Sequence, residues 1–256
     1  YERDFTIPAE WASDPHKITQ LTFGACGYET RVWLNGVPLR TVEGEDVHYG
    51  EYSSFSYELP LEALAAVNRL TVRVSDTVDP QIPRGKQASR IYKQGGIWYQ
   101  TISGAVRSVW LEQVGRNRLR SRLGVVSSLR DRLVEFDVTT RVHEPGVYRL
   151  RLSVTPVGAE KNDSEKGEIY TAEFELQLEA GEHRQRVPLA MPEAKFWSPA
   201  EPNLYPLQTE LVQPNGSVSG IETNFGLRKI SARARHIYLN NEPIYLDGIL
   251  YQPGTS

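Results

Sequence analysis

Residues 28–42 read YETRVWLNGVPLRTV, and this stretch is the best guide to the fold class. Apolar and polar residues alternate on both sides of Asn35-Gly36, and a period of two is typical of β-strands. Both central residues of a type I′ hairpin turn need positive φ, which Asn and Gly adopt at low cost. The stretch therefore predicts a β-hairpin with strands over 28–34 and 37–42.

The same alternation recurs outward from this hairpin and predicts an all-β chain. Residues 60–66 are the one helix-like stretch, because Pro60 is followed by strong helix formers. Further strands are expected over 18–23, 52–59, 70–74, 106–114, 133–142, 146–157, 169–178, 185–189 and 204–212.

The length of 256 residues predicts two domains, because one domain commonly has about 100–150 residues. A junction is expected near residue 115. Short alternating strands between turns over 115–226 indicate an immunoglobulin-like sandwich. Residues 227–256 break this rhythm with a hairpin around Asn240-Asn241 and a final apolar run. We expect this last segment to enter a further domain.

Composition narrows the range of partners and cofactors. Lys and Arg number 29 against 32 for Asp and Glu, so the net charge of −3 indicates no nucleic-acid partner. A single cysteine excludes an internal disulfide framework, and no apolar run is long enough to span a membrane. Tyr1 opens the sequence within a strand pattern and without a leader, so residues before it are expected and the compartment stays open.

Arginines at every second position over 116–122 allow two interpretations, a nucleic-acid patch or a strand with one solvated basic face. The balanced charge of the chain favours the second interpretation.

Catalytic and cofactor motifs are absent from the sequence. Residues 216–220 read GSVSG, which has Val218 where a nucleophile elbow needs serine. The five histidines are scattered without zinc-ligand spacing, and no phosphate or dinucleotide loop occurs. Local spacing places no pair of carboxylates for glycoside hydrolysis. We therefore expect no cofactor, no metal and no catalytic residue in the chain.

The loop over residues 76–104 is the candidate site, because the strand pattern disappears there and loops of such length are commonly functional or disordered. Amide and charged groups can bond sugar hydroxyls, and aromatic rings can stack on a sugar. The alternative is a solvated surface loop held down by Trp98. The candidate contacts are Arg84, Lys86, Gln87, Trp98 and Tyr99.

Ordered motifs then span nearly the whole chain. They are FTIP at 5–8 with Trp11, VWLNG at 32–36, GEYSSF at 50–55, GIWY at 96–99, FWSP at 196–199 and YLNNEPIYLDG at 238–248. In this order and spacing they resemble glycoside hydrolase family 2, the family of β-galactosidases, β-glucuronidases and β-mannosidases.

This resemblance implies a jelly-roll, sugar-binding-like domain over 1–114, an immunoglobulin-like sandwich over 115–226 and the entry of a (β/α)₈ barrel over 227–256. Family members are retaining hydrolases whose two catalytic Glu lie on barrel strands, which would follow Ser256. Tyr245 and Asp247 at the first barrel strand become additional substrate-contact candidates.

The expected function is therefore the non-catalytic front part of a glycoside hydrolase that acts on O-glycosidic bonds, with carbohydrate as the partner. The two sandwiches would support the barrel, and the loop 76–104 would narrow its mouth. The alternative from another class is a free-standing carbohydrate-binding or adhesion protein. A scaffold that has lost activity and a homo-oligomer are also left open.

Overall fold

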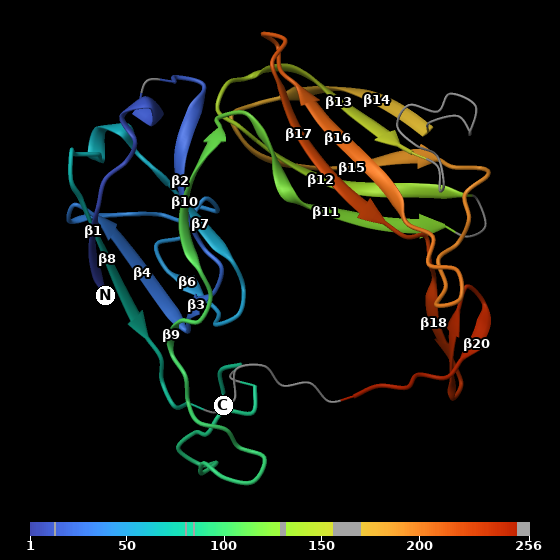
Figure 1. Cartoon of the computed structure of the whole chain (residues 1–256), viewed down its shortest axis with the longest axis horizontal. Coiled ribbons are helices and arrows are strands. Elements are labelled where there is room, and N and C mark those ends of the chain that lie inside the picture. Colours follow the sequence, from blue (N-terminus) through green and yellow to red (C-terminus); the bar gives the residue numbers. More distant parts are fainter. Residues whose placement is uncertain (13, 80, 84, 129–131, 156–169, 250–256) are drawn as a thin grey trace. The chain divides into compact units, whose positions relative to one another are not determined.

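The computed structural model describes residues 1–12, 14–79, 81–83, 85–128, 132–155 and 170–249. Its described part forms two compact units, Tyr1–Gly115 and Arg116–Ile249 (Figure 1). Both units consist of antiparallel strands, and the prediction of an all-β chain built of sandwiches is confirmed.

The first unit contains two main sheets and one short strand pair. The larger sheet has the order β1 (Glu2–Phe5), β8 (Asn68–Ser75), β4 (Glu29–Leu34) and β5 (Val37–Pro38), with β6 (His48–Tyr49) also paired to β4. The second sheet has the order β10 (Val109–Gly115), β2 (Lys17–Phe23) and β7 (Phe55–Leu59). The short pair is β3 (Cys26–Gly27) with β9 (Gly104–Ala105).

The core of the first unit lies between the two main sheets. Phe23 and Phe55 stack with ring centroids 4.9 Å apart, and Tyr57 meets both rings edge-on. Val32 and Leu34 of β4, which belongs to the facing sheet, are also buried in this core. Each such side chain contributes roughly 1.5–3 kcal/mol on burial, so the alternating residues of β2, β4 and β7 hold the sandwich together.

The predicted hairpin at Asn35-Gly36 is confirmed. Asn35 has φ of 51° and Gly36 has φ of 82°, as a type I′ turn requires. The Asn35 side chain also donates to Ala63 O at 2.7 Å and to Asn68 Oδ1 at 3.0 Å. Asn68 is fully buried, and its amide bonds both backbone groups of Ala65 at 2.8 and 2.9 Å. The turn is thereby attached to the start of β8.

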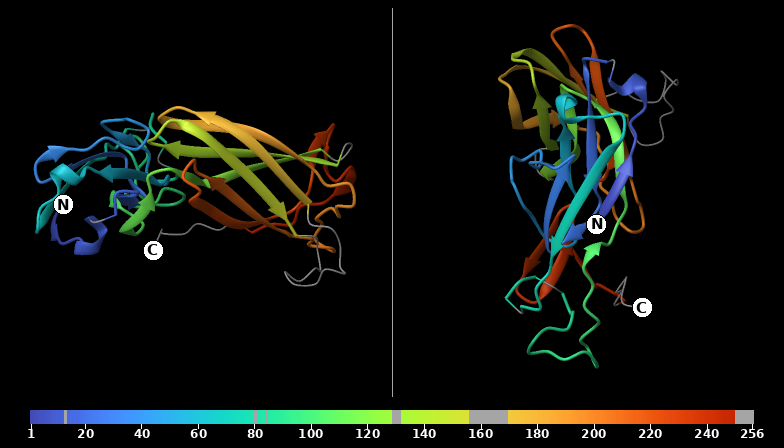
Figure 2. Two further views of the ribbon diagram at one scale, coloured as in Figure 1. Left: turned by 90° about the horizontal axis from the view of Figure 1, so that it is seen from above. Right: turned by 90° about the vertical axis from the view of Figure 1, so that its left-hand side faces the viewer.

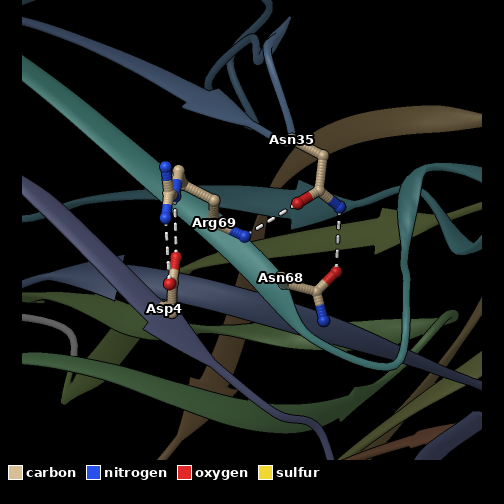
Figure 3. Close-up of polar contacts among 4 residues, drawn as sticks. All are labelled: Asp4, Asn35, Asn68 and Arg69. Carbon is tan, nitrogen blue, oxygen red and sulfur yellow. Dashed lines mark hydrogen bonds and ion pairs between the residues drawn. The ribbon is translucent and has the colours of Figure 1, made fainter.

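A second set of contacts attaches β1 to the same corner (Figure 3). The Arg69 guanidinium donates to both carboxylate oxygens of Asp4, at 2.8 and 3.0 Å, while its backbone N–H donates to Asn35 Oδ1 at 2.7 Å. The ion pair lowers the pKa of Asp4 through the Arg69 hydrogen bonds. Strands β1 and β4 therefore flank β8, and polar side chains as well as backbone pairing attach each of them to it.

The second unit is a sandwich of a three-stranded and a four-stranded sheet. The first has the order β11 (Arg118–Ser128), β12 (Leu133–Val142) and β15 (Gly181–Ala190). The second has the order β14 (Tyr170–Leu178), β13 (Gly146–Val154), β16 (Tyr205–Val212) and β17 (Val218–Phe225). A small sheet of β18 (Ile230–Arg233), β19 (His236–Leu239) and β20 (Glu242–Ile244) follows.

Two features of the second unit are typical of immunoglobulin-like sandwiches. The strand order separates the first, second and fifth strands from the other four, as Greek-key connections require. Tyr205 begins β16, and its hydroxyl bonds the backbone N and O of Lys195 at 2.6 and 3.2 Å, which is the geometry of a tyrosine corner. Burial raises the pKa of Tyr205, so this hydroxyl stays neutral.

Three local expectations need correction. Residues 60–66 contain only a short 3-10 helix, Leu61–Ala63, because Leu64 already has extended dihedrals. Strand β17 is absent from the predicted set. Arg118 is buried rather than solvated, so the alternating arginines do not form one exposed face. The side chain of Arg122 lies outside the described residues.

Candidate functional site

The candidate loop connects β8 with β9 and projects beyond the strand ends of the first unit, as Figure 1 and the right-hand view of Figure 2 show. It has backbone hydrogen bonds of its own. Tyr99 N donates to Lys86 O at 2.8 Å, and Ala88 N donates to Tyr99 O at 2.7 Å. Two distant parts of the loop are thus paired, which sequence periodicity did not indicate.

The tip of the loop is a tight turn that presents aromatic rings. Gly95 and Trp98 exchange two backbone hydrogen bonds, at 2.9 and 3.1 Å. Gly95 and Gly96 have φ of 125° and 59°, and a residue with a side chain would be strained in these conformations. The Trp98 ring stacks on Tyr92, with centroids 4.1 Å apart and an interplanar angle of 13°. The glycines therefore position Trp98 against Tyr92.

The base of the loop is attached to the sandwich by one buried amide. Gln87 Nε2 donates to the two carboxylate oxygens of Glu51, at 2.9 and 2.8 Å, and to the Tyr52 hydroxyl at 3.0 Å. Its Oε1 accepts the backbone N–H of Ile102 at 2.8 Å. Gln87 is 7% exposed and Glu51 is 4% exposed. This arrangement makes Gln87 an anchor of the loop.

The remaining candidates on the loop are more accessible. Lys86 is exposed, while Trp98 and Tyr99 are half-buried. The structure thus pairs the backbone of Lys86 and Gln87 with Tyr99, while Trp98 pairs separately with Gly95; the side chain of Gln87 is buried. Arg84 lies outside the described residues.

A polar hollow of about 410 Å³ opens where the loop leaves β8. Arg73 and Asp76 line it from the end of β8, and Ser103 lines it from the returning chain. Tyr1 packs so closely on Gly104 that a side chain at this position would meet the Tyr1 hydroxyl, and the φ of 100° also favours glycine. Guanidinium, carboxylate and hydroxyl groups in one hollow can bind a ligand that is rich in hydroxyl groups.

The last two candidates belong to the second unit. Tyr245 and Asp247 follow β20, and both side chains are exposed, Tyr245 to 85%. Within the described residues, neither side chain has a hydrogen bond or an ion pair. Their proposed role in substrate contact stays a prediction.

Sequence reasoning missed two residues that shape this site. Tyr92 was available as an aromatic residue in a loop, six positions before Trp98. Glu51 gave no such signal, because it lies 36 positions from Gln87 and belongs to a different segment. Glu51 and Gln87 come within hydrogen-bond distance only in the folded chain.

Within the described residues, the structure provides no metal centre and no free buried acid. No group of three or more His, Cys, Asp or Glu side chains there could hold a metal ion. Glu51 is the one buried acidic residue of that part, and Gln87 occupies both of its oxygen atoms. No helix in the described part is long and apolar enough to cross a bilayer.

Comparison with known proteins identifies a family and several proteins that this chain resembles. Residues 121–228 match the family model of the glycosyl hydrolases family 2. A putative β-glucuronidase of Formosa agariphila is 24% identical over 245 residues, which cover 91% of this chain and 20% of that protein. The chain is therefore similar to glycosyl hydrolase family 2 over residues 121–228, and to this relative over nearly its whole length. A β-galactosidase of Lactococcus lactis is 23% identical over 250 residues, 97% of this chain and 21% of its own length.

Solved structures of two β-glucuronidases share the fold. A Bacteroides uniformis β-glucuronidase matches with a TM-score of 0.71 and 18% identity, over 97% of this chain and 28% of that one. A Bifidobacterium dentium β-glucuronidase complexed with coumarin-3-O-glucuronide matches with a TM-score of 0.66 and 19% identity, over 96% and 42%. This chain spans about a fifth of the length of the curated relatives it matches.

Proposed function

We propose that this chain is the non-catalytic N-terminal part of a retaining glycoside hydrolase that acts on O-glycosidic bonds, of the β-galactosidase or β-glucuronidase kind. The observation that carries the proposal is the all-β fold of the described part, together with its match to about a fifth of the length of two glycosidases. The relatives are named as a putative β-glucuronidase and a β-galactosidase, and these names support a glycosidase activity for the longer protein of which the chain would be the N-terminal part.

In this proposal the two sandwiches support a catalytic barrel that follows residues 227–256, and the loop 76–104 narrows the substrate entrance. The division of the chain into a jelly-roll over 1–114, an immunoglobulin-like domain over 115–226 and a barrel entry over 227–256 is part of the same proposal. Lys86, Trp98 and Tyr99 are the proposed contacts on the loop, and Tyr245 and Asp247 are the proposed contacts near the barrel. Gln87 holds the loop in place.

The test compares residues 1–256 with the longer protein on a panel of aryl β-galactosides, β-glucuronides and β-mannosides. We expect turnover by the longer protein and none by residues 1–256. Turnover by the purified 256-residue chain would place the active site within it and overturn the proposal. Absence of turnover in the longer protein, together with retained binding of oligosaccharides, would support the carbohydrate-binding alternative.

A further inference from the structure

Stacked rings join the two ends of the short segment that anchors the candidate loop. This anchoring segment, residues 50–54, connects β6 with β7, and its Glu51 binds the Gln87 amide. His48 of β6 and Phe55 of β7 stack with ring centroids 3.7 Å apart and an interplanar angle of 12°. Both rings are buried, with His48 8% and Phe55 5% exposed. Since β6 and β7 belong to different sheets, the stack joins the two sheets at the ends of the anchoring segment.

The His48 side of this stack can open more easily than the Phe55 side. Strand β6 has only two residues, and it pairs with β4 through two residue pairs. Phe55 also stacks on Phe23 within the core, with ring centroids 4.9 Å apart. Local opening of a short element costs less free energy than unfolding of a core. The anchoring segment can therefore move with β6 while β7 stays in place.

The surroundings of His48 favour the neutral imidazole. Burial lowers the pKa of His48, while the charges of Glu45 and Glu43 and a backbone hydrogen bond of Gly50 raise it by less. The Ser53 hydroxyl lies 3.4 Å from His48 Nε2 and carries no charge. A proton taken up at His48 is therefore only partly compensated while both rings stay buried.

Neutral groups prevail on the other elements around His48. Burial raises the pKa of Cys26 on β3 and of Tyr57 on β7, so both groups stay neutral. Thr30, opposite His48 on β4, is uncharged. The charged residues of the adjoining segments are Glu29, Arg40, Asp46 and Glu51. Arg40 pairs with Asp46 at 2.8 Å, and Gln87 donates to both oxygen atoms of Glu51.

We propose that the His48–Phe55 stack is a pH-sensitive switch for the candidate loop, in which protonation of His48 releases β6 and the anchoring segment and so separates Glu51 from Gln87. In the released segment the imidazolium is hydrated and titrates near the ordinary pKa of about 6.5. The attached segment binds the proton only at lower pH, so the attachment is fully present above about pH 6.5 and weakens as the pH falls below it. The loop 76–104 is thus held at neutral pH and released in mildly acidic solution.

Amide hydrogen exchange of the 256-residue chain tests this switch, with protection factors that divide out the pH dependence of intrinsic exchange. The N–H groups of Ala88 and Tyr99 are bonded within the loop. Their protection should fall about three- to 30-fold between pH 7.5 and 5, because pH 5 lies about 1.5 pH units below the ordinary pKa of histidine. Carboxylates contribute little over this range, since an ordinary Glu titrates at about pH 4.3. The exchange should be insensitive to urea below about 1 M, since local opening exposes little surface.

Two variants separate the titration of His48 from its packing. His48→Phe keeps a ring that can stack on Phe55 and cannot take up a proton, so protection should vary by less than about twofold over the same pH range. His48→Gln removes the ring as well as the proton, so protection should be lower throughout and equally independent of pH. The matched control is His16→Gln, which changes an exposed histidine and should keep the wild-type fall.

A wild-type protection that stays constant between pH 7.5 and 5 would overturn the proposal. A fall that persists in the His48 variants would overturn it too, as would exchange of the loop amides that follows global unfolding in urea. If His48→Phe does not fold, the flat or falling profile of His48→Gln gives the same decision. No substrate enters the experiment, so its failure would leave the proposed function intact.

Discussion

Replacing Gln87 by alanine is expected to release the loop 76–104 from the first unit. The amide donates to both carboxylate oxygens of Glu51 and accepts the Ile102 N–H, and it is 7% exposed. A hydrogen bond to a charged group contributes about 1.5–3 kcal/mol and a neutral one about 1 kcal/mol. We therefore expect Gln87→Ala to weaken the attachment of the loop by roughly 3 kcal/mol.

The loop can detach without unfolding the sandwich, so the assay must report on the loop itself. The amides of Ala88 and Tyr99 are bonded within the loop and should exchange with solvent roughly 100-fold faster in the variant, since about 1.4 kcal/mol is a factor of ten. Trypsin should cleave after Lys86 and Lys93 sooner than in the wild-type chain. The global unfolding midpoint in urea should change less than these local readouts.

The matched control is Gln94→Ala, because Gln94 is an exposed glutamine of the same loop. A surface change of this kind should alter stability by no more than about 0.5 kcal/mol. If Gln87→Ala leaves exchange and cleavage at the level of Gln94→Ala, the anchor interpretation fails. Gln87 would then return to the set of side chains free to contact substrate.

Two further predictions concern the stability of the first unit. Burial lowers the pKa of His48, so the unfolded chain binds this proton at an ordinary pKa near 6.5 and the folded chain binds it only at lower pH. Urea unfolding should therefore show stability falling from pH 7.5 to 5, and His48→Gln should reduce that fall, whereas the exposed His16→Gln should not. Asn68→Ala removes the bonds to Ala65 and Asn35 and should cost about 2–3 kcal/mol, against less than about 0.5 kcal/mol for the exposed Asn224→Ala. Equal effects of the two asparagine variants would contradict the role of the corner at β8.

Much of the fold could be predicted from local chemistry. The hairpin at Asn35-Gly36 follows from the positive φ that both residues tolerate, and the hairpin at Asn240-Asn241 has φ of 53° and 72° for the same reason. Strand β12 was predicted with its observed bounds because its burial alternates along its whole length. Turn type and side-chain period are properties of neighbouring residues, so sequence alone carries them.

The elements that escaped prediction depend on contacts between distant residues. Strand β17 contains Gly220 and three consecutive exposed residues at 222–224, and it becomes a strand by pairing with β16. Arg118 stands in an alternating basic run that indicates solvent exposure, yet the folded chain buries it. Local pattern could not reveal either outcome, because in both cases tertiary pairing overrides it.

The same distinction separates two kinds of residue within the candidate loop. Gln87 and Glu51 are buried and bonded to each other, so their replacement should act on order and stability. Tyr92 and Lys93 are exposed at the tip, where a change costs little stability. A polar loop of this length stays in one conformation only if something near its base offsets the entropy of ordering it, and the buried amide–carboxylate contact is in that position. Substrate contact at the tip and order at the base should therefore respond to different substitutions, and a variant that lost both together would mean that the aromatic pair itself holds the loop.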